Sequence, residues 1–135
     1  MASRLLTSRV SNIRQAVSGN ANTNIAWKVL LSDCPIQVAN NKIEAGKLSW
    51  AGDSLAAYFV WPQKDPHLLT GVITATGMAG MKAAYANQYF AGGSGFPDFM
   101  IFTGNMPSEG SRAIKLAGFF DNQWRLTEKE YVTQQ

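Results

Sequence analysis

Cysteine and histidine are almost absent from this sequence, which has one of each in 135 residues, Cys34 and His67. A single cysteine excludes a disulfide within the chain and a zinc site built from cysteines. The single histidine precedes Ser94, whereas an α/β-hydrolase triad runs serine, acid, histidine along the chain, so Ser94 and His67 cannot form one in that order. We therefore expect no metal and no cofactor, and a core large enough to stabilise the fold without them.

Charged residues are also few, at 16% of the chain, and the net charge is only +3. The lysines are spread singly along the sequence, whereas a nucleic-acid surface needs a dense basic patch. No apolar run approaches the roughly 20 residues that a membrane span needs. With 46% hydrophobic residues, the composition predicts one folded domain that binds no nucleic acid and has no membrane span.

Acidic residues are missing from residues 1–23, which contain Arg4, Arg9 and Arg14. Apolar residues recur there at helical spacing, so we predict a basic leader or surface helix in residues 1–18. Such a segment leaves organellar targeting open, and no secretory signal is visible. Residues 19–126 are predicted to form the domain, and residues 127–135 a charged tail. The localisation is otherwise open.

Two apolar runs indicate buried strands. Residues 71–75 are followed by a glycine turn, residues 76–81, and a predicted helix at 82–90. Residues 55–61 are apolar throughout, as in a central strand covered on both faces. With further strands predicted at 36–39, 98–102 and 113–120, a short helix at 25–31 and a hairpin at 42–50, we predict a three-layer α/β domain. Its sheet is expected to be mainly parallel, with about five strands flanked by helices.

The glycine turn supplies the candidate ligand site. Exposed amides at a helix N-terminus can hold an anion, which indicates Thr76, Gly77, Met78 and Gly80, with Asp121 at the end of a later strand. The turn lacks the lysine and hydroxyl residue of a P-loop. In the alternative interpretation, Gly77 supplies a turn and Gly80 allows close helix packing, while Asp98 and Asp121 cap the surface. We expect any ligand or partner to contact the edge formed by this turn and the loop after Phe102.

The remaining reactive residues favour structural roles. Ser94 lies in a glycine-rich turn, but Phe96 stands where the nucleophile elbow needs glycine. Cys34, beside a proline, is typical of a small buried apolar group rather than a nucleophile, and His67 is expected to be exposed without a role. The tryptophans favour core packing over an exposed carbohydrate or protein platform: Trp27, Trp50, Trp61 and Trp124.

Several motifs together resemble a known family: the asparagine-rich residues 19–24, residues 26–28 and 31–38, Gly52-Asp53-Ser54-Leu55, Phe96-Pro97-Asp98, and residues 117–124 with their Gly-Phe-Phe. Over about residues 19–126 the chain resembles the C-terminal region of large bacterial prolyl-oligopeptidase-like or esterase-like α/β-hydrolase proteins. The resemblance implies exported parent proteins and transfers no catalytic residue.

Two functions follow as expectations. The first is a non-catalytic accessory or interaction domain whose partner is a hydrolase domain or another protein. The alternative is a small-ligand-binding or enzymatic α/β domain with its site in the loops at the C-terminal ends of the strands. The oligomeric state is left open.

Overall fold

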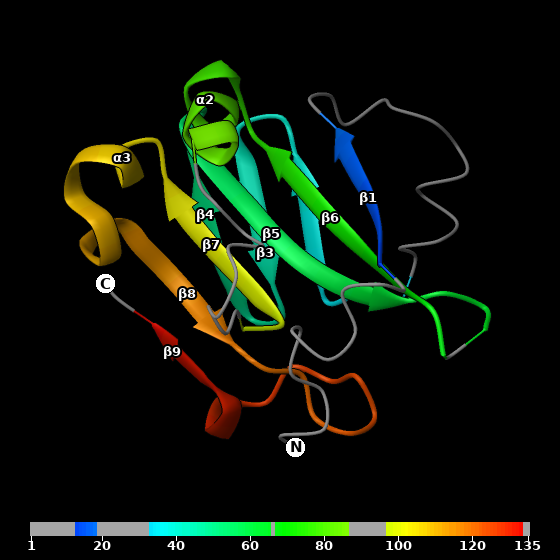
Figure 1. Cartoon of the computed structure of the whole chain (residues 1–135). Coiled ribbons are helices and arrows are strands. Elements are labelled where there is room, and N and C mark those ends of the chain that lie inside the picture. Colours follow the sequence, from blue (N-terminus) through cyan, green and yellow to red (C-terminus); the bar gives the residue numbers. More distant parts are fainter. Residues whose placement is uncertain (1–12, 19–32, 66, 87–96, 134–135) are drawn as a thin grey trace.

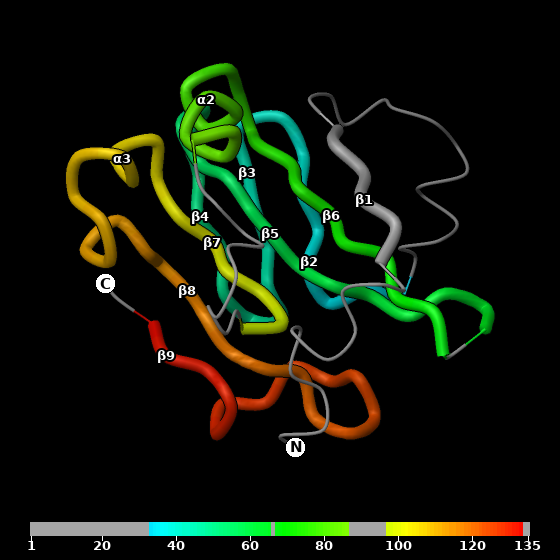
Figure 2. Tube along the Cα trace, viewed as in Figure 1, coloured from blue at the N-terminus to red at the C-terminus, as the bar shows by residue number. Residues whose placement is uncertain are grey.

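Two β-sheets and a helix form the layers of the protein (Figure 1). The structure, a computed structural model, describes residues 13–18, 33–65, 67–86 and 97–133. Figure 2 shows the same path as a tube, with the small sheet behind the large one. Within the described residues, no helix is both long and apolar enough to cross a membrane.

The large sheet has six strands, in the order β1-β6-β5-β7-β8-β9. Its strands are β1 (Ile13–Ser18), β5 (Leu55–Pro62), β6 (Leu69–Ala75), β7 (Phe99–Thr103), β8 (Ile114–Gly118) and β9 (Tyr131–Thr133). The small sheet consists of β2 (Ile36–Ala39), β3 (Lys42–Ala45) and β4 (Leu48–Ala51). The α-helices described are α2 (Met78–Ala86) and α3 (Met106–Glu109), and 3₁₀ turns occupy Gly110–Ala113 and Glu128–Glu130.

The prediction of a mainly parallel sheet is wrong. Every strand pair is antiparallel except β1 with β6. The connection from β5 to β6, residues 63–68, is too short for a parallel crossover, which needs a dozen or more residues. The continuous apolar runs that suggested parallel strands arise because β5 and β6 are buried on both faces of an antiparallel sheet.

One part of the α/β prediction does describe the structure. Strands β6 and β7 are each antiparallel to β5, which lies between them, so they run in the same direction. Helix α2 lies on the connection from β6 to β7. The predicted order of strand, glycine turn, helix and strand is therefore confirmed, with an antiparallel strand inserted between the two parallel ones.

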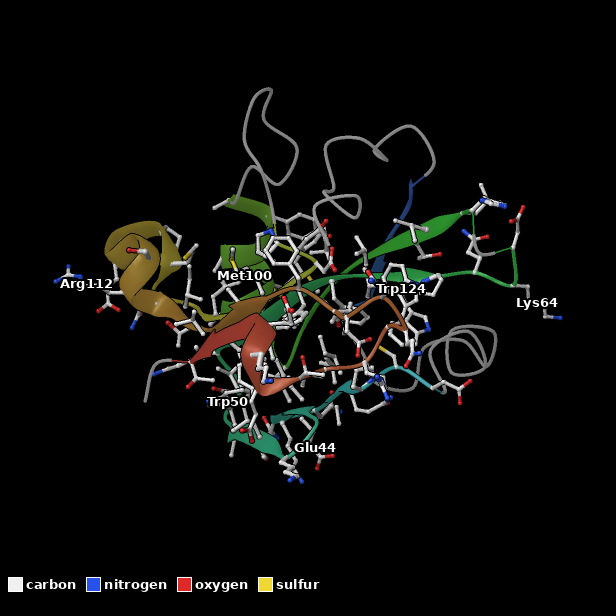
Figure 3. The ribbon with its side chains drawn as sticks, turned by 90° about the horizontal axis from the view of Figure 1, so that it is seen from below. Glu44, Trp50, Lys64, Met100, Arg112 and Trp124 are labelled. Atoms are coloured by element: carbon white, nitrogen blue, oxygen red, sulfur yellow. The ribbon has the colours of Figure 1, made fainter. Side chains whose placement is uncertain are left out.

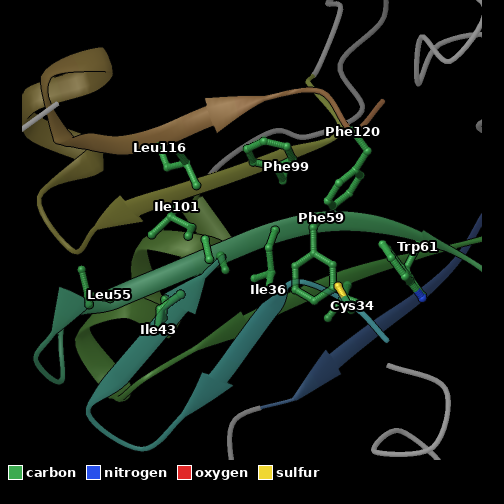
Figure 4. Close-up of a cluster of buried hydrophobic side chains, with 13 residues drawn as sticks. Cys34, Ile36, Ile43, Leu55, Phe59, Trp61, Phe99, Ile101, Leu116 and Phe120 are labelled. Atoms are coloured by element: carbon green, nitrogen blue, oxygen red, sulfur yellow. The ribbon is translucent and has the colours of Figure 1, made fainter. Parts of the chain in front are cut away.

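Alternate side chains of β5 enter two different cores. Leu55, Phe59 and Trp61 pack toward the small sheet, with Ile43 of β3 and Ile101 of β7 among their neighbours (Figure 4). The intervening residues, Ala56, Tyr58 and Val60, pack with Met81, Ala83 and Ala84 of α2 on the other face. This period of two is the pleat of a strand, so the small sheet and the helix cover opposite faces of the large sheet.

The small sheet is made by two tight hairpins, of which the sequence predicts the second, at residues 42–50. Residues 40–41 and 46–47 are two-residue loops, because Ala39 pairs with Lys42 and Ala45 with Leu48. Such loops need positive φ angles, which Asn41 (63°) and Gly46 (58°) supply. Asparagine and glycine are the residues that adopt this conformation most readily.

Both ends of the described chain differ from expectation. Residues 13–18 were predicted within a basic leader or surface helix, but they form β1, parallel to β6. The predicted charged tail contains β9, which pairs with β8. Helix α2 begins at Met78, before the predicted residue 82, and the predicted helix at 25–31 and the turn at 92–95 lie outside the described residues.

Candidate functional site

Most of the predicted site lies where β5 begins, at one end of the strands of the large sheet, which we call this edge of the sheet. Ala75, at the end of β6, pairs with Ala56, and Thr103, at the end of β7, pairs with Leu55. The glycine turn and the loop after β7 therefore lie at the same edge, beside α2 and α3 (Figure 1). This placement confirms the expectation that the two loops share one edge, although the parallel sheet that was its premise is wrong.

Asp121 lies at the opposite edge. Strand β8 ends at Gly118, which pairs with the first residue of β7, Phe99. In Figure 3, Trp124 lies toward the end of the molecule that bears Lys64, whereas Arg112 is at the other end. Asp121 and the glycine turn therefore cannot contact one small ligand together.

Thr76 is held by the backbone of β5. Its amide donates to the Leu55 carbonyl at 2.9 Å, and its hydroxyl accepts from the Leu55 amide at 3.1 Å. The hydroxyl also donates to the Leu55 carbonyl at 3.3 Å, and Thr76 is 4% exposed. The side chain therefore closes the β5–β6 end of the sheet and is turned away from solvent.

Gly77 and Gly80 allow the close approach of α2 to the sheet. A Cβ atom at Gly77 would overlap the carbonyl oxygen of Asp53, and one at Gly80 would overlap that of Leu55. Both positions thus require glycine for packing. The alternative interpretation of the turn proposed this role for Gly80, whereas for Gly77 it proposed only a turn. The anion-binding role of the turn remains a prediction.

Met78 is the predicted site residue whose large side chain reaches solvent, with 72% exposed. Tyr85, seven residues later on α2, is 68% exposed, and Lys82 between them is also exposed. Residues at these spacings share one side of a helix. We call Met78, Lys82 and Tyr85 the α2 face.

The loop that follows β7 is held by hydrogen bonds at the same end of the sheet. The amide of Gly104 donates to the Ser54 carbonyl at 2.6 Å, and that of Asn105 to the Thr103 hydroxyl at 3.3 Å. Met106 packs against the core beneath α2. The loop after β7 therefore lies close to the start of α2, since a Cβ at Gly104 would be 3.3 Å from the Ala79 carbonyl oxygen.

At the opposite edge, Asp121 organises a tight loop. Its carboxylate accepts from the amides of Gln123 (2.9 Å) and Arg125 (2.8 Å) and from the Arg125 guanidinium (3.0 Å). The backbone amide of Arg125 is the main cause that holds the pKa of Asp121 below its ordinary 3.8, and the Gln123 amide and the guanidinium act in the same direction. The carboxylate is thus a local cap, as the alternative interpretation of Asp121 proposed.

Trp124 has an unusual backbone in this loop. Its φ is +62°, a left-handed conformation that costs a non-glycine residue about 1–2 kcal/mol. Its ring lies 5.9 Å from that of Trp61 and 5.8 Å from that of Phe120. Such aromatic pairs contribute about 0.5–1.5 kcal/mol each beyond buried area, so the strain and the ring contacts are of similar size.

Asp98 is buried rather than a surface cap, so that expectation is wrong. The residue is 0% exposed, and its carboxylate accepts from the Phe120 amide at 3.0 Å. Its main-chain carbonyl accepts from the Val60 amide at 2.9 Å. Asp98 therefore joins the start of β7 to the residue before the Asp121 loop, a role visible only when strands distant in sequence are neighbours.

The sequence also singled out Cys34, His67 and Ser94 as reactive residues. Cys34 is 4% exposed, and burial raises the pKa of its thiol to about 12, so the prediction of a buried apolar group is confirmed. His67 is exposed, and its amide donates to the Asp65 carboxylate at 3.0 Å. Ser94 lies outside the described residues. Among the residues described, no three His, Cys, Asp or Glu side chains are grouped to hold a metal.

An open groove of about 370 Å³ beside β9 was not foreseen from the sequence. It is lined by Pro97, Phe119, Tyr131 and Val132 together with neighbouring residues of β8 and the Glu128–Glu130 turn. Val132 is 73% exposed. The groove depends on the pairing of β9 with β8, whereas residues 127–135 were predicted to be a charged tail.

Comparison with known proteins gives one similarity to report. The chain is 33% identical over 79 residues to a protein of Arthroderma benhamiae described as an uncharacterized secreted protein. The match covers 58% of the chain, and the chain spans only 8% of that relative's length. No family model matches the chain, and no solved structure matches it.

These findings overturn the resemblance to prolyl-oligopeptidase-like or esterase-like hydrolases. The similarity found is to an uncharacterized protein, with no hydrolase likeness, and the antiparallel sheets differ from the α/β architecture that the resemblance implied. The Gly-Phe-Phe at residues 118–120, one of the motifs on which the resemblance was based, lies at the end of β8 in an antiparallel sheet.

Gly80→Ala tests the packing role of the glycine turn. In an open helix position alanine is more stable than glycine by about 1 kcal/mol, but here the new methyl group would overlap the Leu55 carbonyl. We expect a loss of about 1–3 kcal/mol of unfolding free energy, the usual effect of overpacking, measured by chemical denaturation. Lys82→Gly, at an exposed position of the same helix, is the control and should show the ordinary loss of about 1 kcal/mol. Unchanged or higher stability of Gly80→Ala would contradict this packing.

Cys34 should be inert in the folded protein. A rise of its pKa from 9.0 to about 12 lowers the thiolate fraction at neutral pH by about 1,000-fold, and burial blocks access. We expect alkylation by iodoacetamide to be slow until guanidinium chloride unfolds the chain, as followed by mass spectrometry. A Cys34→Ala, Ser49→Cys variant, with its thiol at an exposed position, should react at once. Equal rates in the two folded proteins would refute the assignment.

Acid should weaken the Asp121 loop. Because the folded pKa is depressed, the carboxylate stabilises the fold above the unfolded value of 3.8, and this stabilisation is lost as pH falls through the folded pKa. We expect the difference in unfolding free energy between the wild type and Asp121→Ala to narrow below pH 3.8. Denaturant titrations of both proteins at several pH values measure it. A difference that stays constant into acid would show that ionisation of Asp121 contributes nothing.

Proposed function

We propose that this chain is a non-catalytic interaction domain that binds a protein partner through the α2 face. The observation that carries the proposal is the exposure of two large side chains, Met78 at 72% and Tyr85 at 68%, on one side of the helix. Methionine and tyrosine are both enriched in protein interfaces.

The α2 face is well suited to binding because its support is rigid. Met81, Ala83 and Ala84 bury the other side of the helix, and Gly80 lies against the Leu55 carbonyl. A preorganised surface binds with a smaller loss of conformational entropy than a flexible one. Lys82 adds a single positive charge between the two large side chains, which gives a partner one polar feature for orientation.

The relative supports a modular context. It is described as a secreted protein, and the matched segment is a small part of its length. We propose that this chain likewise acts as one domain of a larger secreted protein and connects it to another protein.

The alternative of a small-ligand-binding or enzymatic domain has less support. Its candidate polar groups already accept backbone hydrogen bonds: the hydroxyl of Thr76, the buried carboxylate of Asp98 and the carboxylate of Asp121. A ligand at either edge would have to compete with these bonds, whereas the large side chains of the α2 face, Met78 and Tyr85, are exposed.

Photo-crosslinking tests the interaction surface. The photoreactive amino acid p-benzoylphenylalanine replaces Tyr85 in the protein produced by its own organism, and crosslinked products are identified by mass spectrometry. We expect a discrete product at position 85 that is lost with the second substitution Met78→Asp, whose exposed site should change stability by only about 0.5 kcal/mol. The matched control carries the probe at Lys64, which is exposed at the opposite end of the molecule. No product at position 85, or the same product at both positions, would contradict the proposal.

A further inference from the structure

We propose that Met78 is an oxidation site, and that its conversion to methionine sulfoxide by a peroxide switches off binding at the α2 face while the fold stays intact. The loss of binding rests on the function proposed above. The selective oxidation of Met78 does not, because it can be observed on this protein alone.

The methionines that the structure describes differ widely in exposure. Met78 is 72% exposed, whereas Met81 is 9% and Met100 is 8% exposed, and the last two belong to the core between α2 and the large sheet. Met106 is partly buried and packs against the same core. A peroxide must reach the sulfur atom in order to oxidise it, so Met78 is the described methionine that is most open to attack.

The reaction needs only a peroxide as its second reactant. The sulfur of Met78 donates a lone pair to one oxygen of hydrogen peroxide, so that an S–O bond forms and the O–O bond breaks. The departing hydroxide takes the proton from the transferred oxygen and leaves as water. Sulfur loses the two electrons that the peroxide gains, and methionine sulfoxide reductases reverse the change. Cys34, the single thiol, is 4% exposed, so the oxidant reaches it less readily.

Oxidation of Met78 changes the surface of the protein and not its core. Met78 is the first residue of α2, and most of its side chain is in water, which can hydrate a sulfoxide oxygen. The other side of the helix stays packed on the sheet through Ala83 and Ala84. The same oxidation at Met81 or Met100 would place a polar oxygen in an apolar core, which is unfavourable without a hydrogen-bond donor.

The α2 face depends on Met78 for one of its two large side chains. A thioether offers a partner a flexible and polarizable apolar surface, whereas a sulfoxide is polar and chiral. A partner surface that fits the thioether would have to bury the new oxygen, at a cost in desolvation. Tyr85 and Lys82 are unchanged by the reaction, so any loss of binding is due to Met78.

Peroxide treatment of the folded protein tests the selectivity. Tandem mass spectrometry, with fragments that separate Met78 from Met81, measures the oxidation of each methionine. We expect Met78 to react about tenfold or more faster than Met81 and Met100, and the rates to become equal in guanidinium chloride. Protein oxidised at Met78 should keep its unfolding midpoint. Equal rates in the folded protein, or a lower midpoint after oxidation of Met78, would overturn the proposal.

Photo-crosslinking after oxidation tests the loss of binding. Purified protein with p-benzoylphenylalanine in place of Tyr85 is oxidised at Met78, freed of peroxide and crosslinked in an extract of its own organism. We expect the yield of the position-85 product to fall about tenfold or more, because a buried sulfoxide lacks its hydrogen bond. Methionine sulfoxide reductases should restore the yield. In the control Met78→Leu, whose apolar side chain has a similar size and no sulfur, peroxide should leave the yield unchanged.

The outcomes distinguish failure of the switch from failure of the proposed function. Equal yields from oxidised and unoxidised protein, or the same loss with peroxide in Met78→Leu, would refute the switch and leave the α2 face as an interface. If no product forms even before oxidation, the proposed function fails and the switch fails with it. The mass spectrometry then still shows whether Met78 is the selective oxidation site.

Discussion

The pleat of β5 is the constraint on which the rest of the structure depends. Its alternate side chains fill the core under the small sheet and the core under α2, so neither cover can be lost without exposing half of this strand. Its neighbours β6 and β7 are both aligned on it by antiparallel pairing. Burial of apolar surface stabilises the fold by about 25 cal/mol per Å², and β5 is buried along almost its whole length.

The backbone of β5 also organises the two edges of the sheet. At its beginning, the Leu55 carbonyl accepts from Thr76 and lies against Gly80, which fixes where α2 starts. Near its end, the Val60 amide donates to the Asp98 carbonyl, and Asp98 in turn holds Phe120. The α2 face and the Asp121 loop therefore stand at opposite ends of one strand, with different character: the first is a rigid helix with exposed large side chains, and the second is a polar loop that covers aromatic rings.

Much of the local structure could be predicted because it depends on neighbours in the sequence. The hairpin turns at Asn41 and Gly46 follow from residues that tolerate positive φ. The strand, glycine turn and helix around residues 69–86 follow from an apolar run and the glycines that come after it. The two loops of the predicted site do lie at the same edge, and close packing was offered as the alternative role of Gly80; that they bind a ligand or partner stays a prediction. The site prediction could not tell that Thr76 is buried, because the partner, Leu55, is distant in sequence.

The sequence by itself determined where the inner strands and the hairpin turns lie, although not β1 or β9 at the ends. It also determined that the chain forms a domain with a hydrophobic core and that Cys34 is buried. Only the tertiary structure decided the direction of the strands, since a continuous apolar run records burial on both faces and is the same for parallel and antiparallel neighbours. The pair β5 and β6 is the exception, because the short connection of residues 63–68 already requires antiparallel pairing. The burial of Asp98 and the separation of Asp121 from the glycine turn could not be derived from local patterns, because each depends on pairing between residues far apart in the chain. The left-handed backbone of Trp124 was not foreseen either, and its ring contacts Trp61, which is also distant in the sequence.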